Sequence, residues 1–224
     1  MYKGIIFDLD GTLVDSLDDL TSSLNVAMAK AGLAPRSRDE VRLMIGNGMT
    51  LLVRRAIQGH AGSTEMADRV KESLEADYNL HCLDRTRPYA GIDRLLAQLR
   101  RAGTRIAVLS NKPDAFAASI VAALFPERPF ALVRGQLPGG PTKPDPRAAL
   151  EILGAWGLDA AEAAIVGDSA VDIETARNAG MAALGAAWGF RDRLELESAG
   201  ATAVFDSPGE LTDWLAALGR TTLG

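Results

Sequence analysis

The fold is decided near the N-terminus by the stretch Phe7-Asp8-Leu9-Asp10-Gly11-Thr12-Leu13-Val14-Asp15-Ser16. It completes a short apolar run, residues 4–9, that has the length and composition of a buried strand. Residues two apart on a strand share one face, so Asp8 and Asp10 are expected on the same side where the strand ends. Gly11 then lets the chain turn. Two neighbouring carboxylates favour either a cation between them or a proton on one of them.

Similar apolar runs recur along the chain and alternate with helical patterns. The sequence predicts further strands at residues 105–109, 131–134, 163–166, 181–187 and 202–205. Helices are expected before Gly103 and over residues 115–124 and 146–156. Apolar strands that alternate with helices favour an α/β fold with a doubly wound, Rossmann-like parallel sheet covered on both faces.

Residues 16–82 interrupt this alternation. They show helical periodicity, with Leu17, Leu20 and Leu24 on one stripe, and contain no convincing strand. We therefore expect a helical domain of residues 16–82 inserted into an α/β core of residues 1–15 and 83–224. Such an insertion accounts for a chain of 224 residues, somewhat longer than one domain of about 150 residues.

Composition excludes several classes of protein. The chain has 24 Lys and Arg against 29 Asp and Glu, a net charge of −5, so we expect no nucleic-acid or membrane partner. No apolar run approaches the ~20 residues of a membrane span. Cys82 is the single cysteine, which rules out an internal disulfide framework and predicts a cytoplasmic setting. The composition allows either a monomer or a homodimer.

A second acidic pair, Asp168 and Asp172, follows the predicted strand at residues 163–166. Taken alone, the pair is as compatible with a helix cap as with a metal site. Strands of a parallel sheet end at one edge, where ligands bind in such folds. Four carboxylates that converge there, Asp8 and Asp10 included, repel one another unless a metal is bound. Mg²⁺ prefers such oxygen ligands.

Groups that could bind an anion follow two other predicted strands. Ser110 and Asn111 come directly after the strand at residues 105–109, close to the start of a helix. Lys143 lies between Pro141 and Pro144 on a turn before a helix. A solvated surface lysine is the alternative interpretation, although a lysine between prolines is less typical of one.

Together, these segments resemble the motifs of the haloacid dehalogenase (HAD) superfamily of phosphohydrolases, in the right order. Asp8-Leu9-Asp10-Gly11-Thr12 is similar to its first motif, Ser110 to its second, Lys143 to its third, and Gly167-Asp168-Ser169 with Asp172 to its fourth. The helical insert resembles the small C1-type cap of this superfamily. Within it, Asp15-Ser16, residues 45–48 and residues 87–91 resemble phosphoglycolate phosphatases.

The resemblance implies a role for each matched residue. Asp8 is expected to attack phosphorus and form an aspartyl-phosphate, while Asp10 acts as the general acid and then the general base. Mg²⁺ is expected to be held by Asp8, the Asp10 backbone carbonyl and Asp168, with Asp172 bound directly or through water. The residues expected to bind the phosphoryl group, or to orient the loop that does so, are Thr12, Ser110, Asn111 and Lys143.

The cap is expected to cover the site and to select the leaving group. The candidate specificity residues are Gly46, Asn47 and Gly48, which form one turn, together with Arg55. An ordinary loop between two helices is the alternative interpretation of this turn.

Three functions remain open at this point. The first is a Mg²⁺-dependent phosphatase for a small phosphate ester, with 2-phosphoglycolate as the expected substrate. The second keeps this chemistry but acts on a sugar phosphate, a nucleotide or pyrophosphate. The third is a non-catalytic module that binds a metal or phosphate, although Asp8, Asp10 and Lys143, which such a module would be expected to lose, are all present.

Overall fold

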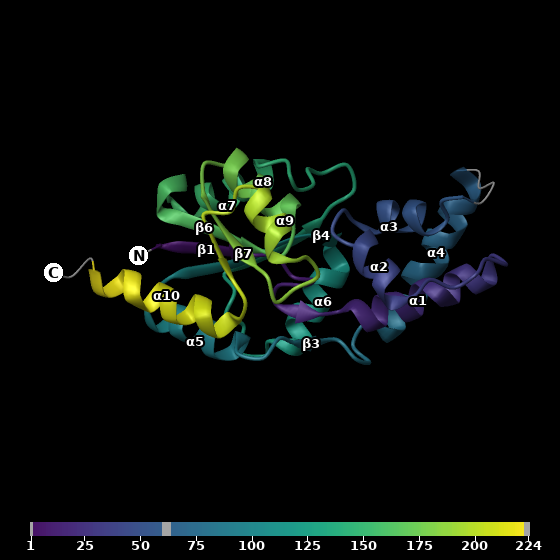
Figure 1. Ribbon diagram of the computed structural model, residues 1–224, viewed down its shortest axis with the longest axis horizontal. Helices are drawn as coiled ribbons and strands as arrows, with labels where there is room; N and C mark the ends of the chain where they lie inside the picture. The colour runs from purple at the N-terminus through teal and green to yellow at the C-terminus, as the bar shows by residue number, and fades with distance from the viewer. Residues whose placement is uncertain (1, 60–63, 222–224) are drawn as a thin grey trace.

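A six-stranded sheet, parallel in every pairing, forms the centre of the α/β part of the molecule (Figure 1). The computed structural model describes residues 2–59 and 64–221. The strand order is β5-β4-β1-β6-β7-β8. The strands are β1 (Gly4–Phe7), β4 (Arg105–Pro113), β5 (Leu132–Gln136), β6 (Ala163–Gly167), β7 (Ala182–Ala186) and β8 (Ala203–Phe205).

Helices cover both faces of this sheet, so the side chains of each strand alternate between two cores. One core contains Ile5 and Phe7 of β1, and the other contains Ile6. The helices on the first face are α5 (Ile92–Arg101), α6 (Asp114–Leu124) and α10 (Pro208–Thr221). Those on the second face are α7 (Arg147–Trp156), α8 (Ala170–Asn178) and α9 (Arg193–Ser198), and a short 3-10 turn (Ala160–Glu162) precedes β6. The predicted doubly wound α/β fold is confirmed.

The register of β1 with its two neighbours sets the position of the functional edge. Phe7, the last residue of β1, pairs with Val108 of β4 and with Val166 of β6. The residues that follow these three therefore emerge at one edge of the sheet. The predicted strand at residues 4–9 ends earlier, at Phe7. The reason is that the Leu9 carbonyl accepts hydrogen bonds from the backbone of the following turn, so the last hydrogen bond to the neighbouring strand is that from the Asp8 N–H to Val166.

In the described part of residues 16–82, the chain forms four helices. They are α1 (Leu17–Lys30), α2 (Arg38–Met44), α3 (Met49–Ala56) and α4 (Thr64–His81), and we call them the helical insert. They lie beyond the end of the sheet, to the right in Figure 1. Their apolar side chains, such as Leu24, Leu74 and Leu52, belong to the same buried cluster as Ile5 and Phe7. Within the described ranges no helix is long and apolar enough to cross a membrane.

A short antiparallel pair of strands, which the sequence did not predict, marks where the chain leaves the sheet and returns to it. β2 (Val14–Asp15) pairs with β3 (Arg87–Pro88). Two residues are too few for an alternating apolar pattern, so strands of this length give no periodic signal.

Asp19 of α1 ties the helical insert to this returning segment. Its buried carboxylate accepts hydrogen bonds from the Thr86 backbone (2.8 Å), the Thr86 hydroxyl (2.7 Å) and the Arg85 backbone (3.0 Å). Burial alone would raise the pKa of Asp19, but the hydrogen bonds from Thr86 and Arg85 outweigh it and hold this pKa below its ordinary value. The carboxylate therefore stabilises the fold in its ionised form.

Asp19→Ala is expected to lower the free energy of unfolding by roughly 2–3 kcal/mol at pH 7, because it leaves buried donors of Thr86 and Arg85 unpaired. A lowered pKa stabilises the fold above the unfolded-state pKa of about 3.9, so the difference from wild type should shrink as the pH falls below about 4. Urea unfolding at pH 7 and pH 3.5 measures both. Asp18→Ala is the control, because Asp18 is 44% exposed and its ion pair with Arg38 is worth at most about 1 kcal/mol. Equal losses in the two variants would contradict the role given to Asp19.

Candidate active site

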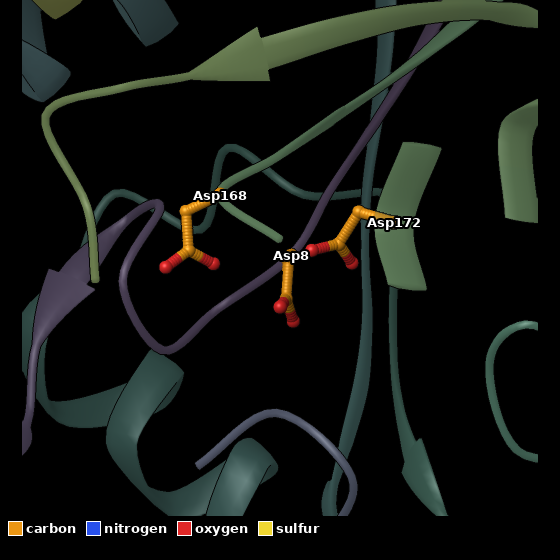
Figure 2. Close-up of side chains that lie close together, drawn as sticks. All are labelled: Asp8, Asp168 and Asp172. Carbon is orange, nitrogen blue, oxygen red and sulfur yellow. The ribbon is translucent and has the colours of Figure 1, made fainter. Parts of the chain in front are cut away.

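Three buried carboxylates meet at the carboxyl ends of β1 and β6 (Figure 2). They belong to Asp8, Asp168 and Asp172, and one oxygen of each lies within 4.8 Å of the others. In the view of Figure 2, Asp8 lies between Asp168 and Asp172. Oxygen donors this close together suit a hard divalent cation such as Mg²⁺. The sequence prediction that these carboxylates converge is therefore met for three of the four.

Asp8 is fixed by the turn that ends β1. Its N–H donates to the carbonyl of Val166 (2.9 Å), and its Oδ1 accepts from the N–H of Leu9 (2.6 Å). Gly11 has a φ of +82°, and a Cβ at this position would lie 2.1 Å from Asp168 Oδ2. Only glycine therefore allows the first turn to approach Asp168 this closely.

The start of α8 holds the other two carboxylates. Asp172 Oδ2 accepts a hydrogen bond from the Ser169 hydroxyl (2.6 Å), so Asp172 takes part in capping its own helix. A Cβ on Gly167 would lie 2.2 Å from the Asp172 Cβ, which makes glycine necessary here as well. Both alternatives for this pair, helix cap and metal site, are compatible with the geometry, because the other oxygen of Asp172 faces the cluster.

Lys143 supplies the positive charge inside the cluster. Its Nζ lies 2.9 Å from Asp8 Oδ1 and 2.6 Å from Asp172 Oδ1. Burial would lower the pKa of Lys143, but Asp172 and Asp8 outweigh it and keep this pKa above its ordinary value. Asn111 holds the lysine in place, since its Oδ1 accepts from the Lys143 N–H (2.8 Å) and its Nδ2 donates to the Lys143 carbonyl (3.1 Å). Lys143 is thus a buried partner of carboxylates and not a surface residue.

The negative charge at this edge exceeds what Lys143 neutralises. Burial, followed by repulsion from Asp172 and Asp8, raises the pKa of Asp168 well above its ordinary value. Burial also raises the pKa of Asp8, to about 7, although Lys143 acts in the opposite direction. A divalent cation among these oxygens would offset the repulsion, so the residues present fit a bound metal.

Asp10 lies apart from this cluster, on the wall of the adjoining pocket. Lys112 Nζ contacts both of its carboxylate oxygens at 3.0 Å, and the Ser16 hydroxyl donates to Oδ1. Lys112 is itself buried and lies 4.6 Å from the ring centre of Tyr78, which comes from α4. From the sequence, a role was expected for Asn111 but none for its neighbour Lys112. The predicted strand ended at residue 109, whereas β4 continues to Pro113 with a shift in register.

A further segment of the site, Trp188 to Arg191 after β7, was missed from the sequence. The Phe190 N–H donates to Asp168 Oδ2 (2.8 Å), and Trp188 Nε1 donates to the Thr12 carbonyl (3.0 Å). A Cβ on Gly189 would lie 2.2 Å from the Gly11 carbonyl oxygen. A glycine between aromatic residues at the carboxyl end of a predicted strand was the signal that could have revealed this segment.

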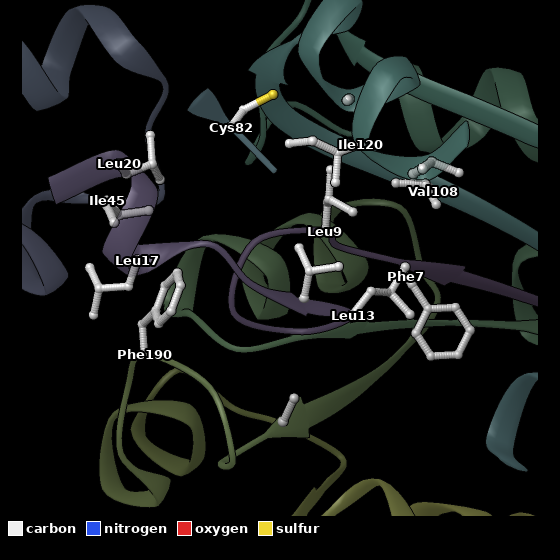
Figure 3. Close-up of a cluster of buried hydrophobic side chains, with 14 of the residues drawn as sticks. Phe7, Leu9, Leu13, Leu17, Leu20, Ile45, Cys82, Val108, Ile120 and Phe190 are labelled. Carbon is white, nitrogen blue, oxygen red and sulfur yellow. The ribbon is translucent and has the colours of Figure 1, made fainter. Parts of the chain in front are cut away.

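The pocket lies between the sheet edge and the helical insert. Asp8, Asp10, Ser110 and Asp168 line one side, and Leu20, Ile45, Gly46, Gly48, Met49 and Leu52 of the insert line the other. Figure 3 shows Leu20 and Ile45 beside Leu17 and Phe190. Gly48 approaches the α/β part closely, because a Cβ there would lie 2.9 Å from Gln136 Oε1.

Five of the predicted residues lie outside the pocket lining: Lys143 and Asp172, which are buried behind Asp8, and Thr12, Asn47 and Arg55. Arg55 donates to Asn47 Oδ1 (2.8 Å) and to the Met44 carbonyl (2.7 Å), so these two side chains bind each other within the insert. Thr12 is fully buried, and within residues 2–59 and 64–221 its hydroxyl has no hydrogen-bond partner.

Comparison with known proteins agrees with this geometry. Residues 5–186 match the family model of the haloacid dehalogenase-like hydrolases. A phosphoglycolate phosphatase of Rhodospirillum rubrum is 37% identical over 221 residues, which cover 96% of this chain and 91% of that protein. A phosphoglycolate phosphatase of Mesorhizobium japonicum is 34% identical over 207 residues, or 91% of each chain.

Solved structures agree as well. The crystal structure of a predicted phosphoglycolate phosphatase from Haemophilus somnus superimposes with a TM-score of 0.89 at 29% identity, covering 96% of this chain and 98% of that one. The resemblance inferred from the four motifs is therefore confirmed. With its motifs gathered at one sheet edge and a family match over most of its length, the chain belongs to the haloacid dehalogenase-like hydrolases.

Proposed function

We propose that the protein is a Mg²⁺-dependent phosphatase that hydrolyses 2-phosphoglycolate to glycolate and phosphate. The observation that carries this proposal is the position of Asp8, which lines the pocket and contacts Lys143 within a cluster of three carboxylates. The names of the relatives from Rhodospirillum and Mesorhizobium support the choice of substrate.

Asp8 would be the nucleophile. An oxygen of its carboxylate attacks phosphorus, the bond between phosphorus and the ester oxygen breaks, and an aspartyl-phosphate forms. Mg²⁺ held by Asp8, Asp168 and Asp172, with the Asp10 backbone carbonyl as a further proposed ligand, would neutralise charge on the phosphoryl oxygens. Lys143, held by Asn111, adds a fixed positive charge at the same place, and Ser110 is the hydroxyl donor on the pocket wall.

Asp10 would transfer the protons. It donates one to the departing alkoxide, then takes one from the water that attacks the aspartyl-phosphate, which releases phosphate and restores Asp8. Lys112 and Ser16 hold its carboxylate in a single orientation at the pocket wall. A base fixed in this way needs little reorganisation before proton transfer.

The helical insert would act as a cap that selects a small leaving group. Its turn at Gly46 and Gly48 lies directly against the α/β part, with the Gly46 carbonyl 3.1 Å from Asn111 Nδ2. Because this turn contacts Asn111 directly, we expect a two-carbon ester to fit the site better than a nucleotide. We propose that the cap extends over residues 16–82 and that Asn47 and Arg55 act indirectly, by holding the turn.

Wild-type protein is expected to release phosphate from 2-phosphoglycolate faster than from sugar phosphates, nucleotides or pyrophosphate, and only with Mg²⁺. Asp8→Asn should reduce kcat by a factor on the order of 10³ or more, because the amide is a poor nucleophile. Phosphate release over this panel measures both. Comparable rates across the panel would contradict the substrate but keep the chemistry. Binding of Mg²⁺ and phosphate without any turnover would instead support a non-catalytic module.

Asp168→Asn is expected to raise the Tm of the metal-free protein at pH 8 by a few degrees, because it removes a buried charge that burial and Asp172 oppose. Because the folded-state pKa of Asp168 is raised, the stability that the neutral carboxyl allows is fully present at low pH. This stability is lost as the pH rises through the folded-state pKa. The gain should therefore shrink as the pH falls toward about 4. Thermal melts over this range measure the effect.

The same melts with Mg²⁺ test the metal site. Mg²⁺ should raise the Tm of wild type and leave that of Asp168→Asn nearly unchanged, since a ligand is lost. Asp213→Asn, at a carboxylate that is 73% exposed, is the control and should behave like wild type in both series. A Mg²⁺ shift of wild-type size in Asp168→Asn would remove Asp168 from the ligand set.

A further inference from the structure

The C-terminal end of α2 lies next to the pocket and carries backbone carbonyls that the helix cannot pair internally. Such carbonyls give a helix C-terminus a partial negative charge and attract cations. Arg55, from the following helix of the insert, donates a hydrogen bond to the Met44 carbonyl. The remaining carbonyls at this end are bound from outside the insert.

Arg191, from the segment after β7, binds these remaining carbonyls. It donates to Arg42 O through Nη1 (2.6 Å), and to Leu43 O (3.2 Å) and Ile45 O (2.9 Å) through Nη2. Its Nε faces Glu195 at 3.4 Å, and its side chain is only 13% exposed. All three of its nitrogens therefore have acceptors, and a single guanidinium from the α/β part caps the C-terminal end of a helix in the insert.

The segment that carries Arg191 is rigidly attached to the α/β part. The residues just before it bind there through the Phe190 N–H on Asp168 and the Trp188 indole on Thr12. Gly189 packs against the first turn at a distance that excludes any side chain. Arg191 therefore joins α2 to a segment that is itself bound to the α/β part.

The other contacts at this end are the packing of Val41 and Ile45 in the buried cluster and the hydrogen bond from Arg55 to the Met44 carbonyl. Val41 is its one fully buried residue, and Leu43 is 63% exposed. The carbonyl of Ile45, which Arg191 binds, immediately precedes Gly46 in the turn that lines the pocket. Besides the hydrogen bond from Asn111 to the Gly46 carbonyl, the position of this turn over the pocket thus depends on hydrogen bonds from a charged donor, which are stronger than those between neutral groups.

We propose that Arg191 is a positioning residue: by binding the end of α2 it holds the turn at residues 45–48 over the pocket and thereby sets how tightly substrate is bound. This inference rests on the proposed function for its kinetic consequence. Its structural part concerns the protein alone and can be tested without any substrate.

Hydrogen exchange of the metal-free protein tests the structural part. Arg191→Met keeps the aliphatic stem but removes every donor, so amides in residues 42–49 should exchange roughly tenfold faster than in wild type. Arg191→Lys, which can reach fewer carbonyls, should lie between the two. Arg193→Met is the matched control, because Arg193 pairs with Glu197 and Asp206 within the α/β part. Equal exchange of this segment in Arg191→Met and Arg193→Met would overturn the proposal.

Kinetics tests the consequence for substrate. Arg191→Met should raise KM for 2-phosphoglycolate roughly tenfold and change kcat less than about twofold, because Arg191 lines the pocket but binds the end of α2 and Glu195 and none of the groups that do the chemistry. A fall in kcat with unchanged KM would overturn the positioning role, since that pattern belongs to damage at the reacting groups. If wild type does not hydrolyse 2-phosphoglycolate, the proposed substrate fails, and the exchange comparison alone decides the role of Arg191.

Discussion

The rest of the structure depends on the concentration of negative charge at the carboxyl ends of β1 and β6. Asp8, Asp168 and Asp172 are buried there within a few ångströms of one another, with Lys143 as their partner. Burial and mutual repulsion raise the pKa of Asp8 and of Asp168, so the arrangement costs free energy in the absence of a cation. Other interactions in the fold must therefore hold these carboxylates together and offset this cost.

Those interactions come from close backbone approach and from neutral hydrogen bonds. Gly11, Gly167 and Gly189 let three separate turns meet at distances that exclude a Cβ. Asp168 accepts from a backbone N–H of Phe190, and Asp172 from the hydroxyl of Ser169. Neutral donors thus orient Asp168 and one oxygen of Asp172, while Lys143 binds Asp8 and the other oxygen of Asp172.

The helical insert is joined to this edge by a small number of specific contacts. Asp19 binds the returning chain near Thr86, Lys112 lies against the ring of Tyr78, and Arg191 binds the end of α2. Each contact involves a charged group that is largely removed from solvent, where hydrogen bonds and cation–π contacts are worth more than at the surface. The pocket between the two parts therefore has a defined shape, with the turn at Gly46 and Gly48 on one side.

The sequence alone determined the strands of the six-stranded sheet, the insert of helices and most of the charged residues at the sheet edge. These features are local: apolar runs end at Asp8 and before Asp168, and such patterns can be recognised within ten residues. Only the tertiary structure decided which charges pair. Lys112 binds Asp10, Arg191 binds α2, and Arg55 binds Asn47 within the insert. The register of β4 and the packing of the insert direct these side chains, and both depend on residues distant in the chain, which no local pattern encodes.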